Sequence, residues 1–239
     1  LRMVSYPGEV GVALYARLAG KHGNMKIPVQ CENPQVEEIS SRLQKFRDHI
    51  VPGAQIEDGT DYRVTGCDVN AQFLAAAASV ELGDGDPMTI ETPRSVDGLL
   101  KLPGYFEIAR EVNTGHSAFG RLKKGEWLTT QSAEYLTKYL AEKDRDVKLS
   151  VSKAVVWQSS SRGRRLSAWA RQMRTAREQL APAAPDDLGS AYALMVVKAI
   201  YTAFLGGMLR SDKRNKTGTM RPDWSDQVVT LAHANMWRA

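Results

Sequence analysis

The chain has 239 residues, of which 43% are hydrophobic and 25% are charged, which is the composition of a globular protein with one domain or two small ones. Its longest apolar run, from Ala191 to Leu209, is interrupted by Lys198, and no stretch resembles a signal peptide, so the sequence argues against a membrane span and predicts a cytoplasmic, nucleoid-associated protein. Residues 147–239 carry 15 Lys and Arg against 6 Asp and Glu, whereas residues 1–146 carry 17 against 21, and this basic second half predicts contact with a polyanion.

In the first half of the chain, capping residues and apolar spacing predict two helices with clear starts. Asn33 and Pro34 open a helix over 34–50, and Thr129 caps a helix over 130–142. The other expected elements are an irregular segment over 1–33, a strand over 61–68, a helix over 70–82, strands over 88–92 and 105–112, and a glycine-rich connection over 113–126.

The second half is expected to contain a strand over 147–151 that leads into 155–157, followed by three helices over 160–180, 189–210 and 222–238. The first of these helices is amphipathic. A linker over 181–187 and a loop over 211–220 separate the helices. The helix over 189–210 is apolar on nearly all sides, so we expect it to be buried, with Lys198 either paired or extending its amine to solvent. We expect a domain over 1–180 on which 181–239 packs, and a start at Leu1 without an initiator Met suggests a piece of a longer protein.

Asp68 is the strongest candidate for a metal ligand. It follows one predicted strand and precedes a predicted helix, and a carboxylate held rigidly at a strand end suits Mg²⁺, which takes oxygen ligands. In-line phosphoryl transfer uses two such ions roughly 4 Å apart, and the N-terminus of the following helix would attract phosphate. The alternative is that Asp68 and Asn70 cap a core helix whose Phe73 faces inward.

No acidic residue lies between positions 146 and 178, a stretch that is rich in arginine. Arginine forks match phosphate geometry, so we expect a nucleic-acid contact here and in the basic loop at Lys213 and Arg214. The expected contact residues of the stretch are Arg162, Arg164, Arg165, Arg171, Arg174 and Arg177. Trp157 or Trp169 would add a stacking platform for single-stranded DNA. The alternative is a solvated helix face that is basic without binding anything.

Two short motifs resemble those of family B DNA polymerases. The run Asp68-Val-Asn-Ala-Gln-Phe73 resembles the first catalytic motif, and Lys198-Ala-Ile-Tyr-Thr-Ala-Phe-Leu-Gly206 resembles the second. The second motif departs from the family at Thr202, Ala203 and Leu205, where Asn, Ser and Tyr are usual. The resemblance implies that Asp68 binds a catalytic metal, that Phe73 stacks under the sugar of an incoming nucleotide, and that Lys198 contacts its triphosphate.

The end of the chain resembles the C-terminal region of the telomere-associated proteins of linear actinobacterial replicons. Two runs carry this resemblance, Met220-Arg-Pro-Asp-Trp-Ser-Asp-Gln and Ala232-His-Ala-Asn-Met-Trp-Arg238. The resemblance implies a protein of DNA replication that binds the single-stranded DNA at a replicon end (telomere) and docks the terminal protein that primes end replication.

The same resemblance implies an α+β fold with a small antiparallel, palm-like sheet. Asp68 would lie at a strand end, helices would pack on one face of the sheet, and the helix over 189–210 would stand in the position of polymerase fingers. One carboxylate does not hold two metal ions, so we do not expect this stretch to be catalytic by itself. The alternatives are a Mg²⁺-dependent family B-like polymerase or primase that is completed beyond Ala239, and an unrelated globular domain with a basic surface.

Overall fold

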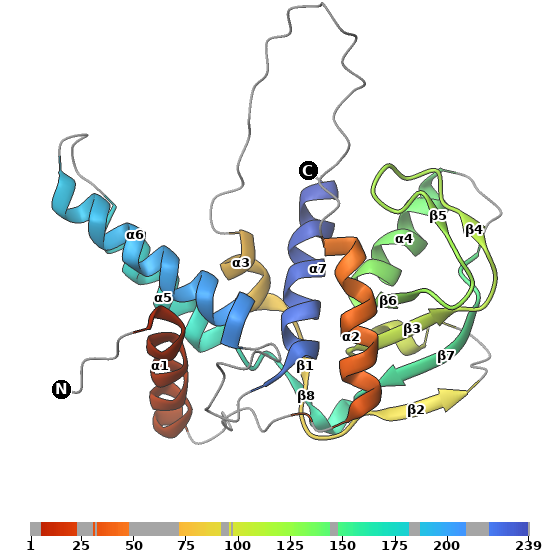
Figure 1. Ribbon diagram of the computed structural model, residues 1–239, viewed down its shortest axis with the longest axis horizontal. Helices are drawn as coiled ribbons and strands as arrows, with labels where there is room; N and C mark the ends of the chain where they lie inside the picture. Colours follow the sequence, from red (N-terminus) through yellow and green to blue (C-terminus); the bar gives the residue numbers. More distant parts are fainter. Residues whose placement is uncertain are drawn as a thin grey trace, which may run out of the picture.

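The computed structural model describes residues 6–22, 31, 33–47, 72–91, 96, 98–143, 148–181, 187–208 and 220–238. Its longer helices are α1 (Pro7–His22), α2 (Pro34–Arg47), α3 (Gln72–Ser79), α4 (Thr130–Glu142), α5 (Ser167–Gln179), α6 (Leu188–Ala203) and α7 (Pro222–Arg238). Short helical turns are η1 (Leu99–Lys101), η2 (Ser159–Ser161) and the π-helical η3 (Phe204–Met208). Figure 1 shows helices at one end, a sheet at the other, and α7 between them.

Four antiparallel strands form the main sheet. They are β2 (Met88–Glu91), β7 (Val151–Val156), β3 (Gly104–Ile108) and β6 (Trp127–Thr129), in that spatial order. Tyr105 pairs with Val155 and with Thr129, and Phe106 pairs with Ala154. Because side chains alternate between the faces of a strand, Phe106 and Ala154 lie on one face and Tyr105 and Val155 on the other.

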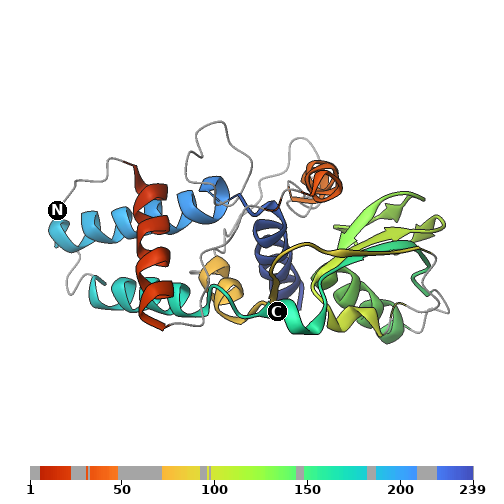
Figure 2. The same cartoon turned by 90° about the horizontal axis from the view of Figure 1, so that it is seen from below.

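Both faces of the sheet are covered. On one face Phe106 and Ala154 join a core with Leu136 of α4, and on the other Tyr105 and Val155 join a core with residues of α2, as Figure 2 also shows. The prediction of an α+β fold with a small antiparallel sheet is confirmed. The part of the prediction that placed the helices on one face of the sheet was wrong, because α2 covers the second face.

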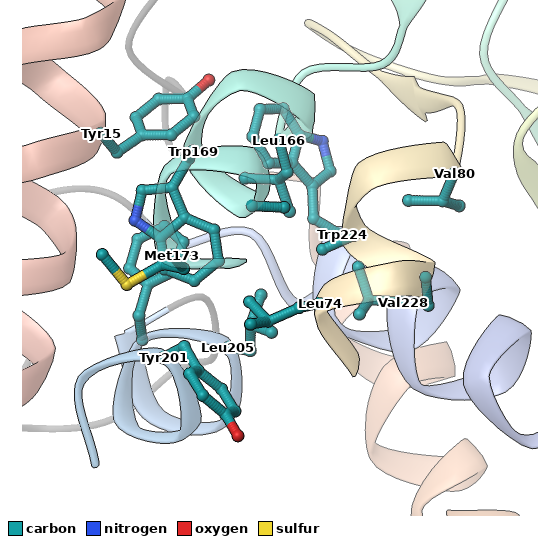
Figure 3. Close-up of a cluster of buried hydrophobic side chains, with 14 of the residues drawn as sticks. Tyr15, Leu74, Val80, Leu166, Trp169, Met173, Tyr201, Leu205, Trp224 and Val228 are labelled. Atoms are coloured by element: carbon teal, nitrogen blue, oxygen red, sulfur yellow. The ribbon is translucent and has the colours of Figure 1, made fainter. Parts of the chain in front are cut away.

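A third core holds the helical end together (Figure 3). It brings together side chains from α1, α3, α5, α6, η3 and α7, among them Tyr15, Leu74, Trp169, Tyr201, Phe204 and Trp224. Trp169 donates its indole N–H to the Gly11 carbonyl at 3.1 Å, and a side chain at Gly11 would meet Phe204 at 2.7 Å. Helix α1 therefore lies close against both its neighbours, and glycine is required at that crossing.

Helix α7 is the central element. It packs against α2, α3 and α4, and ten of its residues are buried, including Asp223, Ser225, Asp226 and Gln227. Trp224 and Val228 belong to the helical core, whereas Ala234 belongs to the core under the sheet. The two ends of the molecule therefore share one helix.

Two predicted elements are interrupted by short two-stranded pairings. The expected strand over 105–112 ends at Ile108 after a register shift, and β4 (Val112–Asn113) pairs instead with β5 (Arg121–Leu122). The expected helix over 160–180 begins only at Ser167, because β8 (Arg162–Gly163) pairs with β1 (Leu82–Gly83). Pairing of residues 162 and 163 with β1 therefore replaces the first turns of the expected helix.

The expectations for α1 and α6 were wrong. Residues 1–33 were expected to be irregular, but Pro7 starts a helix that runs to His22. The helix over 189–210 was expected to be buried, but only Val197 and Tyr201 of α6 are buried, because among the described residues α6 packs against α1, α5 and η3 and leaves its outer side exposed. Within the described residues, one segment, Leu188–Gly207, is long and apolar enough to cross a membrane by length and composition.

We predict that Gly83→Ala destabilises the protein by about 3 kcal/mol or more, since overpacking of a core costs about 1–3 kcal/mol and this contact is unusually close. A Cβ at Gly83 would lie 2.0 Å from the ring of Trp157, which is fully buried and donates its indole N–H to the Gly85 carbonyl. Chemical denaturation measures the change. The matched control is Gly98→Ala, where a Cβ meets nothing within 4 Å and φ is −67°; equal stability of the two variants contradicts the prediction.

Candidate nucleic-acid interface

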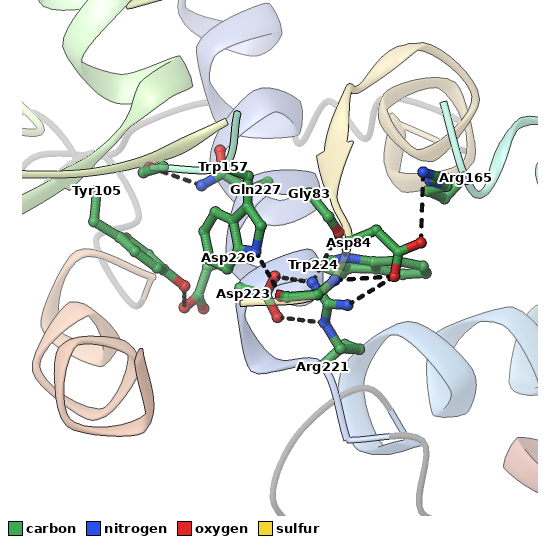
Figure 4. Close-up of polar contacts among 12 residues, drawn as sticks. Gly83, Asp84, Tyr105, Trp157, Arg165, Arg221, Asp223, Trp224, Asp226 and Gln227 are labelled. Carbon is green, nitrogen blue, oxygen red and sulfur yellow. Dashed lines mark hydrogen bonds and ion pairs between the residues drawn. The ribbon is translucent and has the colours of Figure 1, made fainter. Parts of the chain in front are cut away.

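The run Arg221-Pro-Asp-Trp, which carries part of the family resemblance, is buried at the start of α7. The guanidinium of Arg221 donates two hydrogen bonds to the carboxylate of Asp223, at 2.9 and 2.6 Å, and a third to the Gly83 carbonyl at 2.8 Å (Figure 4). Trp224 donates its indole N–H to the same carbonyl at 2.7 Å, and the Arg221 guanidinium lies 4.7 Å from the centre of a Trp224 ring. These residues hold the turn after β1 against α7.

The following turns of α7 bind the sheet in the same way. Tyr105 donates its hydroxyl proton to Asp226 at 2.9 Å, and Gln227 donates to the Gly104 carbonyl at 2.9 Å. Thr230 and Thr129 are joined through their hydroxyls at 2.8 Å. Asp226, Gln227 and Thr230 are therefore structural, because each forms a hydrogen bond with a buried group of β3 or β6.

Burial and the neighbouring Asp223 carboxylate shift the pKa of Arg221 in opposite directions. Burial disfavours the charged form of the Arg221 guanidinium, but the Asp223 carboxylate and its hydrogen bonds outweigh burial and raise the pKa of Arg221 above its usual value. Burial also raises the pKa of the Tyr105 phenol well above its usual range. Tyr105 therefore remains a neutral hydrogen-bond donor at any physiological pH.

The predicted nucleotide site is described only in part. Asp68, the proposed metal ligand, lies outside the described residues, as do Lys213 and Arg214. Phe73 is half-buried near the start of α3 and packs against the helical core, which is the role that the alternative interpretation gave it. Lys198 is exposed on α6. The structure therefore does not show a site that combines these residues.

Two of the predicted phosphate-binding arginines are engaged in ion pairs. Arg162 pairs with Glu81 at 3.3 Å and donates a hydrogen bond to the Lys101 carbonyl. Arg165 pairs with Asp84 at 3.5 Å, and less than a fifth of either side chain is exposed. Both arginines precede α5, so the expected single arginine-rich helix face is not formed.

Three arginines remain open to solvent. Arg164 precedes α5, and Arg171 and Arg174 lie on its outer side, all three exposed. Among the described residues, no carboxylate forms an ion pair with any of them. Arg177 is half-buried, with its guanidinium 5.9 Å from the centre of the Tyr201 ring. The exposed basic surface is therefore Arg164, Arg171 and Arg174, and we call it the α5 arginine surface.

A shallow groove of about 380 Å³ adjoins this surface. It is lined by Leu18 of α1 and by Ala168, Arg171, Gln172 and Thr175 of α5. Hydroxyl, amide and guanidinium groups therefore line one hollow on the same side of α5, which is a combination that suits a phosphodiester backbone. Leu18 was not anticipated as a lining residue, because residues 1–33 were expected to be irregular rather than to form a helix beside α5.

The tryptophans proposed as stacking platforms are not available to bases. Trp157 and Trp169 are fully buried, and each donates its indole N–H to a backbone carbonyl. The expectation of stacking on either ring was therefore wrong, because both side chains fill cores instead.

A second hollow, of about 510 Å³, lies where the helical end meets the sheet. Its lining includes Glu81, Lys101, Thr130, Glu134 and Arg162. These residues come from four separate segments, and their spacing in the sequence carries no signal. Among the described residues, no group of three or more His, Cys, Asp and Glu side chains could hold a metal ion.

Comparison with known proteins adds no assignment. No protein-family model matches the chain, and no curated protein and no solved structure shows significant similarity to it. The resemblances to family B polymerases and to telomere-associated proteins therefore depend on short motifs alone.

We predict that Asp223→Asn lowers the free energy of unfolding by about 3–5 kcal/mol, because it leaves the charge of Arg221 buried without its partner. Thermal and urea unfolding measure the loss. The matched control is Glu38→Gln, which removes an exposed carboxylate paired with Arg42 on α2 and should change stability by only a few tenths of a kcal/mol. A loss in Asp223→Asn no larger than in Glu38→Gln would show that the buried pair contributes nothing.

Proposed function

We propose that this chain binds DNA as part of the replication of linear replicon ends, and that the α5 arginine surface makes the contact. The single observation that carries the DNA contact is the exposure of Arg164, Arg171 and Arg174 without an acidic partner among the described residues. Long exposed arginines beside acids usually form ion pairs, whereas these remain available to phosphate.

Charge distribution along the chain supports the same surface. No acidic residue occurs between positions 146 and 178, and Glu81 and Asp84, which lie beside this stretch, are already paired with Arg162 and Arg165. Glu178, exposed near the end of α5, is the one acidic residue of that helix. Phosphate approaching Arg164 and Arg171 would therefore meet positive charge, and the neighbouring carboxylate on α5 is Glu178, one turn after Arg174. Neutralised phosphates release condensed counterions, which is the main source of affinity in such contacts.

The assignment to replicon ends, the preference for single-stranded DNA and a terminal-protein partner are drawn from the resemblance of residues 220–238. With Trp157 and Trp169 buried, base stacking no longer supports a single-strand preference. The proposal therefore predicts binding dominated by phosphate contacts, and the comparison of single-stranded with double-stranded DNA is part of its test.

We expect the chain to bind single-stranded DNA with an affinity that falls steeply with salt, and the triple variant Arg164→Ala, Arg171→Ala and Arg174→Ala to bind roughly tenfold more weakly or worse. The slope of log affinity against log salt should fall by about 2, because each lost phosphate contact removes about 0.7. Fluorescence anisotropy of a labelled oligonucleotide, single-stranded and then duplex, measures both quantities.

The matched control removes three other exposed arginines, Arg42, Arg110 and Arg121, and so changes the net charge equally. It should keep most of the affinity. Equal losses in the two triple variants would show a non-specific effect of net charge, and unchanged binding in the first would remove α5 from the interface.

If residues 1–239 were an active polymerase, they would extend a primer on a DNA template. We expect no primer extension with Mg²⁺ or Mn²⁺, because the polymerase-like motif offers the single carboxylate of Asp68 and two-metal catalysis needs more. The assay uses a primed template, with Asp68→Ala as the control. Extension by the wild type that disappears in Asp68→Ala would establish the polymerase alternative instead.

A further inference from the structure

The outer face of α6 and the adjoining η3 carries an uncharged stripe with the sequence spacing of a coiled-coil seam. Its six positions alternate in steps of four and three residues, and every one of them is exposed: Leu188, Tyr192, Met195, Ala199, Thr202 and Gly206. Leu188 is 79% exposed, Tyr192 66% and Met195 58%. Such a stripe fits one neighbouring helix at a shallow crossing angle.

Side-chain size varies along the stripe in a regular way. The large residues occupy the first half and the small residues the second, and the positions are symmetric about residue 197. If two copies of α6 lie antiparallel, Leu188 faces Gly206, Tyr192 faces Thr202 and Met195 faces Ala199 of the other copy. Each large side chain then meets a small one, which is the complementarity that close-packed helices need.

Gly206 provides a second, independent observation. Among the described residues, a Cβ placed on Gly206 meets nothing within 4 Å, and the φ of Gly206 lies outside the left-handed region, so neither packing against these residues nor backbone conformation requires glycine. Glycine in a helical segment costs about 1 kcal/mol relative to alanine. A close approach by a group from outside the described chain, such as the Leu188 side chain of a second copy, explains it.

We propose that α6 is a self-association surface, on which a second copy of this chain docks its own α6 in antiparallel orientation. The symmetry of the stripe selects a second copy over an unrelated helix, because one sequence supplies both the large side chains and the gaps that receive them. Figure 1 shows α6 along an edge of the molecule, away from the four-stranded sheet, where two copies can approach. The proposal does not depend on DNA binding.

The expected association is weak. Ten residues of α6 and η3 are exposed on this side, whereas a stable interface uses about 20–30 residues from each partner. Lys198 is the single charged residue of Leu188–Met208, and in the antiparallel pair the two Lys198 side chains lie on the same side near the symmetry axis and repel each other. The dimer should therefore have a micromolar Kd and tighten when salt screens this repulsion, whereas the DNA contact weakens with salt.

The test exchanges residues that face each other. Ala199→Met places methionine against Met195 at both contacts, Met195→Ala leaves alanine against alanine, and the double variant Met195→Ala with Ala199→Met restores one large and one small residue at each contact. Both residue types are good helix formers, and both positions are exposed, so the monomer should fold normally, which circular dichroism checks. Sedimentation equilibrium in about 0.5 M NaCl, over about 1–300 µM protein, measures the Kd.

We expect each single exchange to raise the Kd by about tenfold or more, and the double exchange to return it to within about threefold of wild type. A wild-type chain that remains monomeric up to the highest concentration overturns the proposal. A dimer that the single exchanges leave unchanged, or that the double exchange does not restore, overturns it as well, because α6 would then pair with a different surface.

Discussion

The buried ion pair between Arg221 and Asp223 is the interaction on which the rest of this structure depends. A guanidinium and a carboxylate can be buried together only if most of their hydrogen bonds are made. Here the Nη2 group of Arg221 donates both to Asp223 and to the carbonyl of Gly83, and its Nη1 group lies 3.8 Å from the carboxylate of Asp84. The hydrogen bond to Gly83 fixes β1 against α7, and β1 in turn pairs with β8. The arginine-rich segment therefore leaves the core in a direction that is set by the C-terminal helix.

Because of this arrangement, the Arg221-Pro-Asp-Trp motif has a structural role rather than a binding role. Arg221, Asp223 and Trp224 have the residue types of a binding site, but all three are directed into the protein and satisfy one another or the backbone. The motif therefore specifies how the helical end and the sheet are joined. A second protein with the same motif would be expected to have the same junction, but not necessarily the same ligand. Contacts with other molecules must be made by exposed residues outside this motif.

Local signals predicted the elements that local interactions determine. Thr129 caps α4 and Pro34 starts α2 as the sequence indicated, and the C-terminal helix begins at Pro222. The start of α5 was missed because Leu166, Trp169 and Met173 keep helical spacing, while the pairing of β8 with β1 depends on residues about 80 positions away. For the same reason the partners of Arg162 and Arg165, Glu81 and Asp84, could not be read from the sequence. The burial of α6 was overestimated because apolar composition does not reveal whether another element covers the helix.

The position of α7 also has a consequence for the order in which the protein can fold. Its side chains belong to two hydrophobic cores, and its polar groups complete β3 and β6, which lie about a hundred residues earlier in the chain. During synthesis, the sheet and the first helices therefore emerge long before the helix that closes them, and their apolar surfaces stay incomplete until residues 220–238 have left the ribosome. Contacts of such long sequence separation slow folding and favour aggregation of the intermediates.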